Sequence, residues 1–238
     1  MNNKWIVIFI FSMVTLGAIA QISSAKITYE RKTNLYKKMK NGNVKDWIKE
    51  ADKIKIDYFE LVLNDTCSAF KPQESELKEN FGWATQKNTV YQNFNNNKLY
   101  LIKDMWGEPI HITDSLYQRK WQITESTRKI AGYQCIKAVW RANDTTRIYA
   151  WFSYDITTST GPESFCGLPG TILGLATEDG GVVYFAKKIE LIKSEAVALV
   201  PPKKKKIYTM KTLWDDMYKQ YGKEKWFKGE WNEQFGIW

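Results

Sequence analysis

The sequence predicts a mainly β (α+β) fold, in which a single curved antiparallel sheet, a half-barrel meander, carries a C-terminal helix. Three observations favour it. Aromatic residues make up 15% of the 238-residue chain, and such broad side chains pack well on a pleated sheet. Apolar and polar residues alternate with a period of two along most of the chain. Helical spacing of apolar residues is confined to the C-terminal region.

Short turn-forming segments separate the expected strands. Asn95-Asn96-Asn97 and Asn143-Asp144 are examples, since Asn and Asp tolerate the backbone angles of tight turns. Residues 33–54 are polar and rich in lysine, which predicts a loop or a short helix. The expected strands span residues 26–32, 56–63, 88–94, 98–103, 109–113, 120–124, 133–142, 147–154, 171–176 and 182–192.

The C-terminal region differs from the rest of the chain. Apolar residues between Met210 and Tyr221 recur at spacings of three and four, which predicts an amphipathic helix. Pro201-Pro202 and the four lysines that follow predict a stiff, charged linker before it. We therefore expect a signal peptide over residues 1–20, an antiparallel β domain over 21–200, and the linker and helix over 201–238.

The first residues have the pattern of a signal peptide. Lys4 precedes an apolar run over residues 5–16, and Ala18-Ile19-Ala20 predicts cleavage before Gln21. A second cleavage site after Ala25 stays open. The alternative, a membrane anchor, is disfavoured because the run is short and no stop-transfer pattern follows. The expected protein is exported, to the periplasm, the cell surface or the medium, and does not span a membrane after cleavage.

The amino-acid composition limits which partners and cofactors we expect for this chain. The chain has 35 basic and 26 acidic residues, a net charge of +9. For an exported protein this excess favours anionic lipid, glycan or an acidic protein surface over nucleic acid. A solvated basic face without a partner explains the charge equally well. With one His and three Cys, a zinc site built from these residue types alone would need all four, so we expect no metal and no cofactor.

The sequence predicts no catalytic residue. A Ser or Cys nucleophile would depend on His111, the sole histidine, which lies between Ile110 and Ile112 and is expected to face solvent. The chain contains no nucleophile elbow, phosphate-binding loop or zinc-protease motif. A carboxylate pair leaves no sequence signature, so a carboxylate-based hydrolase in the concave face is the alternative.

A long loop over residues 155–170 contains the most distinctive motif. Its glycines and prolines fix or permit unusual backbone angles, so it either covers a pocket mouth or packs against the sheet as a crossover. Three cysteines in an oxidising compartment predict one disulfide, and of the three pairings we favour Cys135–Cys166, which would tie the loop to the central hairpin. The motif-loop residues are Gly161, Pro162, Gly167, Leu168, Pro169 and Gly170.

Several short motifs occur together in a fixed order. They are Trp121-Gln122-Ile123, Ile130 to Cys135, Ala150-Trp151-Phe152, Gly161-Pro162 and Phe165 to Leu173. In this order they resemble the GLPGLI family of exported bacterial proteins over residues 26–215, except that Thr171-Ile172 stands where the motif has Leu-Ile. The resemblance implies export, one β-rich domain and association with TonB-dependent outer-membrane transport systems. It supplies no catalytic residues.

The end of the β domain is also similar to the half-barrel of the lipoprotein carriers LolA and LolB, which hold acyl chains in a concave face. That likeness implies an apolar pocket lined by Trp140, Trp151, Phe152 and Tyr184, unless these side chains fill a core. We therefore predict a non-catalytic binding or accessory protein that holds a lipid-like ligand or assists a TonB-dependent receptor. The alternatives are the hydrolase and a protein–protein docking module.

Overall fold

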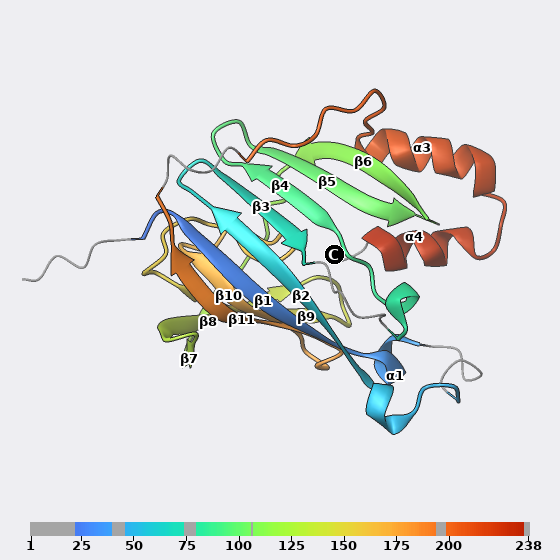
Figure 1. Ribbon diagram of the computed structural model, residues 1–238. Helices are drawn as coiled ribbons and strands as arrows, with labels where there is room; N and C mark the ends of the chain where they lie inside the picture. The colour runs from blue at the N-terminus through green and yellow to red at the C-terminus, as the bar shows by residue number, and fades with distance from the viewer. Residues whose placement is uncertain (1–21, 40–45, 74–79, 106, 194–198, 236–238) are drawn as a thin grey trace, which may run out of the picture.

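A computed structural model describes residues 22–39, 46–73, 80–105, 107–193 and 199–235 (Figure 1). The predicted signal peptide and its cleavage site before Gln21 lie outside these ranges. No helix within the described ranges is long and apolar enough to cross a membrane.

One open sheet of eleven antiparallel strands forms the body of the protein. The spatial order is β6-β5-β4-β3-β2-β1-β11-β10-β9-β8-β7, so β1 lies in the middle and the edges are β6 and β7. The strands are β1 (Ala25–Asn34), β2 (Ile54–Leu63), β3 (Cys67–Pro72), β4 (Thr89–Asn93), β5 (Lys98–Met105), β6 (Glu108–Ser115), β7 (Gln122–Ile130), β8 (Tyr133–Arg141), β9 (Arg147–Ser153), β10 (Thr171–Thr177) and β11 (Val182–Leu191).

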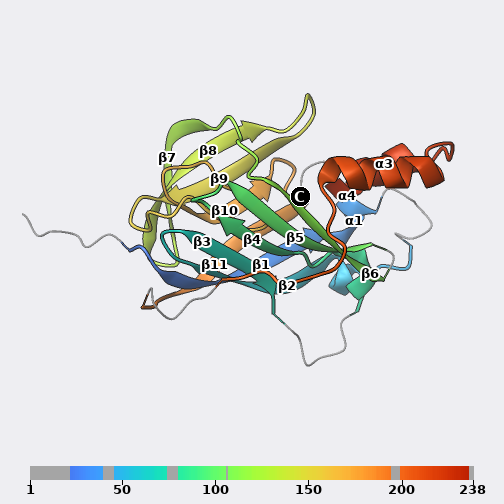
Figure 2. The same ribbon diagram turned by 90° about the horizontal axis from the view of Figure 1, so that it is seen from above.

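The sheet bends around one interior, with β4–β6 on one side and β8–β10 on the other (Figures 1 and 2). A single apolar cluster fills most of that interior and joins Val90 of β4 to Ala138 of β8. Phe59 and Phe70 stack at its centre, with ring centroids 4.8 Å apart and planes within 7°. Burying such side chains is the main stabilising contribution to a sheet of this kind.

Two helices at the C-terminal end cover the β6 edge. They are α3 (Met210–Tyr221) and α4 (Phe227–Phe235), and a short helix α1 (Leu35–Lys38) follows β1. Thr209 caps α3 by accepting a hydrogen bond from the Thr212 backbone N–H. Leu213 and Phe227 of the two helices pack with Ile112 of β6. Backbone hydrogen bonds from Tyr208 to the β6 backbone also shield this edge from further strand pairing.

The predicted fold class is confirmed, because the molecule is mainly β with an open, curved antiparallel sheet and a helical C-terminal end. It departs from the prediction in two details. Strand β3 was not expected, since its Pro72, Lys71 and inward Ser68 weaken the alternation. The C-terminal region forms two helices rather than one.

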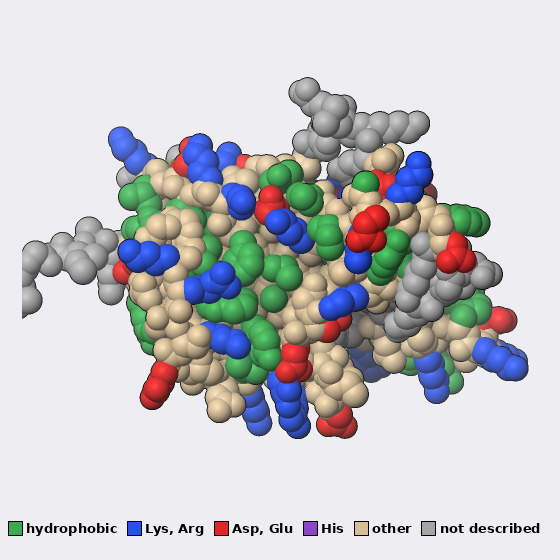
Figure 3. Space-filling model, turned by 90° about the horizontal axis from the view of Figure 1, so that it is seen from below, with side chains coloured by type: hydrophobic (Ala, Val, Ile, Leu, Met, Phe, Trp, Pro, Cys, Tyr) green, Lys and Arg blue, Asp and Glu red, His purple; other side chains and the backbone are tan. Residues whose placement is uncertain are grey.

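Basic side chains surround an apolar area on the face of the molecule that Figure 3 shows.

Candidate functional site

The interior changes character along strands β1 and β2. At one end, Tyr29 of β1 is the register partner of Phe59 of β2, and both are fully buried. Two residues further along, Arg31 is paired in register with Asp57 and both remain almost fully buried. Strict alternation in the two strands therefore directs a row of polar side chains into the same interior that the apolar core fills. We call this the charged end.

Asp57 is the centre of the charged end. Its Oδ2 accepts hydrogen bonds from Arg31 Nη2 at 2.7 Å and from Thr85 Oγ1 at 3.1 Å, and its Oδ1 accepts one from Lys55 Nζ. Burial by itself raises the pKa of Asp57, but Arg31 and the hydrogen bonds from Lys55 and Arg31 outweigh it, so the pKa lies below its usual value. The carboxylate is therefore ionised at neutral pH.

Glu163 brings a second buried carboxylate from the motif loop. Its backbone has a left-handed φ of 55°, which is uncommon for a residue other than glycine. The carboxylate accepts hydrogen bonds from the Tyr184 hydroxyl at 2.6 Å and the Asn88 amide at 3.0 Å, and Arg31 lies 3.9 Å away. Burial raises the pKa of Tyr184 well above its usual value, so its hydroxyl stays protonated and donates to Glu163.

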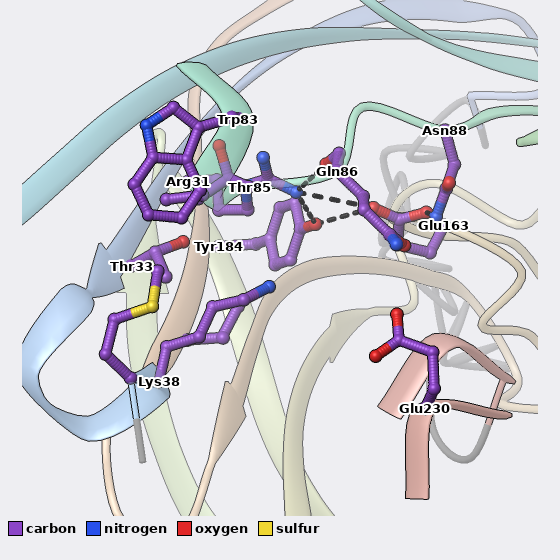
Figure 4. A pocket seen from close by; sticks show the side chains of 13 residues that line it. Arg31, Thr33, Lys38, Trp83, Thr85, Gln86, Asn88, Glu163, Tyr184 and Glu230 are labelled. Atoms are coloured by element: carbon purple, nitrogen blue, oxygen red, sulfur yellow. Dashed lines mark hydrogen bonds and ion pairs between the residues drawn. The ribbon is translucent and has the colours of Figure 1, made fainter. Parts of the chain in front are cut away.

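The charged end adjoins a cavity of about 240 Å³, which we call the charged cavity and which Asp57 and Lys55 do not line (Figure 4). The indole of Trp83 stands at one side of it, and Trp83 is 70% exposed. Glu230 reaches the cavity from α4, so the C-terminal helices contribute to the site. Arg31, Asn88, Glu163 and Tyr184 line it as well, together with Thr33 and Gln86.

One polar atom in this cavity lacks a partner. Asn88 is 2% exposed, and its Nδ2 donates to Glu163, but its Oδ1 makes no hydrogen bond with any described residue. Nearly all buried polar atoms in folded proteins are hydrogen-bonded, so an unpaired acceptor in a cavity indicates a donor supplied by a ligand or water.

The chemistry of the cavity suits a polar, polyhydroxylated ligand. An indole face contacts the C–H face of a sugar ring, while amide, carboxylate and guanidinium groups bond its hydroxyls. Two carboxylates in one cavity, Glu163 and Glu230, are also the residue type that hydrolases use for proton transfer. Within the described residues, no three of His, Cys, Asp and Glu come together as a metal site requires.

The motif loop packs against the sheet and also reaches this cavity. A Cβ on Gly170, whose φ is 156°, would lie 2.1 Å from the Ser153 carbonyl oxygen, so only glycine fits. Leu168 is buried in the apolar core, and Ile172 N–H bonds the Thr160 carbonyl at 2.8 Å. Gly161 approaches Ile172 in the same manner. The loop is thus not the expected crossover but a long packed connection between the adjacent antiparallel strands β9 and β10, and it presents Glu163 to the cavity.

Three of the four aromatic residues expected to line a pocket fill the core instead. Trp140, Phe152 and Tyr184 belong to the apolar core cluster, whereas Trp151 points to the opposite face of its strand and packs against Phe185. Tyr184 also lines the charged cavity, and Trp140 lines a different one, so the four do not form one apolar pocket.

The structure differs from two further expectations drawn from the sequence, the Cys135–Cys166 disulfide and the exposure of His111. Cys135 and Cys166 are not bridged: all three cysteines, each within the described ranges, are free thiols. The Cys135 thiol lies near the Tyr133 carbonyl and the Cys166 thiol near the Tyr117 carbonyl. His111 does not face open solvent, since it is 8% exposed and its Nδ1 lies 3.0 Å from the Tyr100 hydroxyl.

Sequence reasoning missed most residues of the charged end and of the charged cavity. Lys55 and Asp57 alternate with Ile54, Ile56 and Tyr58, and no polar inner face was predicted for the strand expected over residues 56–63. The signal was present, since a charged residue at every second position of a strand rich in isoleucine indicates a polar inner row. Glu163 and Asn88 carry no comparable signal, because a loop and a turn bring them into place.

Comparisons with known proteins bear on this site. The family model described as "N-glycanase peptide, N-terminal domain" matches residues 36–215. No curated protein matches the chain. Two solved structures of PNGF-II, in space groups C2 and P21, share its fold with TM-scores of 0.55 and 0.54 at 20% and 18% identity. They align with 82% and 83% of this chain but with 32% and 33% of their own, so this chain spans about a third of their length.

The family match corrects the resemblances drawn from the sequence. Membership of the GLPGLI family and the likeness to LolA and LolB are wrong, since the match is to an N-glycanase domain. The motif that suggested these resemblances includes Gly170, where the close approach of the Ser153 backbone leaves room only for glycine. The motif therefore reflects a packing requirement of the fold and does not indicate a function.

The expected function is corrected as well. A non-catalytic binding or accessory protein is wrong, because the matching family is named for an enzyme, and the hydrolase alternative lies closer. The expected absence of catalysis therefore loses its support. A TonB-dependent receptor and a lipid-like ligand, which rested on the two resemblances, are not tested by the described residues.

Proposed function

The chain belongs to the family of N-glycanase N-terminal domains, and on that premise we propose that it acts in the hydrolysis of N-linked glycans, with the charged cavity binding the sugar. The observation that carries the binding part is the buried Asn88 Oδ1, an acceptor without a described partner beside the exposed Trp83. A sugar hydroxyl or N-acetyl N–H supplies the missing donor, and the indole supports the apolar face of the ring.

Hydrolysis of an N-linked glycan adds water to the side-chain amide of asparagine. The water oxygen bonds to the amide carbon, the C–N bond breaks, and the nitrogen leaves with a proton, so the step needs a proton acceptor and a donor. Glu163 already accepts hydrogen bonds on both oxygens. We assign the proton transfer to Glu230, which lines the cavity from α4. In this assignment Glu163 is a positioning residue.

Export is part of the same proposal. N-glycosylation marks surface segments of secreted proteins, so an enzyme acting on them meets its substrate outside the cytoplasm. The pattern of residues 1–20 supports this location.

The test uses the full chain and a fluorescent N-glycosylated peptide, with binding measured by anisotropy and glycan release by mass spectrometry. Trp83→Ala is expected to weaken binding about tenfold, because an aromatic contact contributes about 1–1.5 kcal/mol. Trp47→Ala is the matched control, since Trp47 is equally exposed, at 74%, but does not line the cavity.

A second variant separates binding from chemistry. Glu230→Gln preserves the size of the side chain and removes the proton acceptor, so binding should persist while release falls at least a hundredfold. A chain that neither binds nor releases the glycan would overturn the proposal. Binding without any release by the unaltered chain would overturn its hydrolytic part.

A further inference from the structure

A second buried charge lies outside the charged end. Arg119 precedes β7, is 8% exposed, and its guanidinium carbon lies 3.9 Å from the centroid of the Phe165 ring. The rings of Tyr117 and Trp140 are 5.1 and 5.2 Å from the same atom. Three aromatic side chains therefore surround the guanidinium.

The hydrogen bonds of Arg119 are incomplete. Nη1 donates to the Ser164 carbonyl at 3.0 Å and Nη2 to the Ser164 hydroxyl at 3.2 Å, both neutral acceptors. The buried Nε makes no hydrogen bond with any described residue, and no described carboxylate forms an ion pair with the group. Burial lowers the pKa of Arg119 to about 10, the direction expected for a cation removed from water.

The aromatic rings do not replace an anion here. Cation–π attraction acts on the face of the guanidinium, whereas its N–H donors lie in the plane of the group and need acceptors at its edge. A buried charge without an opposite charge is strongly unfavourable, and natural proteins pair nearly all of them. Arg119 thus has the environment of a cation whose anionic partner comes from elsewhere.

Arg119 lines a cavity of about 510 Å³, which is large enough for one sugar unit. Trp140, Ala142 and Leu99 form apolar parts of its wall. Two carboxylates also line it, and both are engaged: Glu163 bonds Tyr184 and Asn88, and Asp114 Oδ2 accepts from the Met210 backbone at the start of α3. Glu163 lines both this cavity and the charged one, so the two cavities adjoin.

We propose that Arg119 and its aromatic surround form a second site, which binds the carboxylate of an acidic sugar unit of the glycan. The inference rests on the proposed function for the class of ligand, while the site itself rests on the unpaired Arg119. The sugar ring lies against the apolar wall near Trp140, and its carboxylate bonds the free edge of the guanidinium. The chain then accepts glycans that carry a negative charge as well as neutral ones.

The test observes Arg119 directly in the full chain. The Nε–H signal of Arg119 is identified by nuclear magnetic resonance from its loss in Arg119→Lys, and the unaltered protein is titrated with glucuronate, glucose, acetate and N-acetylglutamate at constant ionic strength. Glucuronate should move the signal saturably and bind at least fivefold more tightly than acetate or N-acetylglutamate. Glucose, which has the same ring without the carboxylate, should leave the signal in place.

A cavity-filling variant checks the location without altering the charge. Ala142→Leu should weaken glucuronate binding about tenfold, measured by calorimetry, while the Arg119 signal stays visible. An unmoved Nε–H signal overturns the site. A response to acetate that glucuronate does not exceed, or tighter binding of N-acetylglutamate, overturns the acidic sugar as its ligand.

The two proposals fail separately. Trp83→Ala should weaken binding of neutral glycan about tenfold and leave glucuronate binding unchanged. If the chain binds glucuronate at Arg119 but no N-glycosylated peptide, the proposed function is wrong and the anion site stands. If it binds the peptide but not glucuronate, the anion site is wrong and the proposed function stands.

Discussion

The two ends of the sheet interior are built from the same strands and have opposite chemistry. At the apolar end, Ile27 of β1 lies opposite Leu61 of β2, within a cluster that excludes water. At the charged end, Arg31 lies opposite Asp57, and Thr33 opposite Lys55, with burial nearly as complete. The pairing of β1 with β2 does not distinguish the ends, because its register continues without a shift from Ala25 to Asn34, although the pairing of β1 with β11 shifts between Thr28 and Tyr29.

The difference shows what each end contributes. Apolar burial stabilises the fold in proportion to area, whereas a buried ion pair recovers little more than the cost of removing its charges from water. A charged network in a position that a core could occupy is therefore poor as a source of stability. Its presence beside a cavity and the unpaired Asn88 Oδ1 agrees with the binding role proposed above.

Removing the central charge should produce the largest effect. Asp57→Ala leaves Arg31 and Lys55 buried without their main acceptor, so the free energy of unfolding should fall by about 3–5 kcal/mol. Urea denaturation measures it. Glu178→Ala is the control, because its ion pair with Arg147 is exposed to solvent and should contribute little to stability.

The stability lost in Asp57→Ala should also depend on pH. The folded-state pKa of Asp57 lies below the unfolded value near 4, so its contribution is complete above about pH 4 and is lost as the pH falls through the folded value. The stability difference between the wild type and Asp57→Ala should therefore shrink in acid. A difference that stays constant down to pH 2, or a loss no larger than that of Glu178→Ala, would contradict the assignment.

The apolar end should respond to loss of volume rather than of charge. Leu61→Ala removes a fully buried side chain and leaves a cavity in the core, which should cost about 3 kcal/mol in denaturant unfolding. Val62→Ala, on the other face of the same strand, is the control and should cost at most about 1 kcal/mol. Unlike that of Asp57→Ala, the loss should be the same at pH 2 and pH 8, and a strong pH dependence would refute the contrast.

Tyr29 lies where the two ends meet. Its hydroxyl donates to the Ile172 carbonyl at 2.6 Å across the interior, and this links β1 to the strand that follows the motif loop. Tyr29→Phe keeps the ring and leaves a buried carbonyl unpaired, so stability should fall by about 2 kcal/mol. Tyr58→Phe, whose hydroxyl bonds Glu30 at the surface, should change stability by less than about 0.5 kcal/mol in the same unfolding assay. Equal losses of stability in Tyr29→Phe and Tyr58→Phe would show that the hydrogen bond from Tyr29 to Ile172 does not stabilise the junction of the two ends.

The sequence predicts the apolar end far better than the charged one. Alternation locates nearly every strand, because a buried face leaves a period of two wherever it occurs. The site depends instead on contacts between distant residues: Arg31, Asn88, Glu163 and Tyr184 come from two strands and two loops. Their meeting follows from β1 pairing with both β2 and β11, a non-local arrangement that local patterns do not encode. Lys55 and Asp57 were the exception, since their alternation with isoleucine was visible and was overlooked.

The smallest effect comes from a lysine at the margin of the charged end. Lys103 is fully buried, donates to Gln86 Oε1, and lies 5.3 Å from the centroid of the Phe235 ring. Burial lowers its pKa to about 8, below the unfolded value near 10.4, so the folded chain loses this proton first as the pH rises.

Between these values the unfolded chain binds more protons, and the stability contributed at Lys103 must increase with pH. From pH 8 to pH 9.5 the wild type should gain about 1.5 kcal/mol relative to Lys103→Met, which keeps the length of the side chain and cannot titrate. Urea unfolding of both proteins over this window measures the gain, and the other titrating groups, which both proteins share, cancel in the difference. Parallel curves for the two proteins would mean that Lys103 keeps its charge when buried, as Arg31 does, and that the charged end extends to this residue.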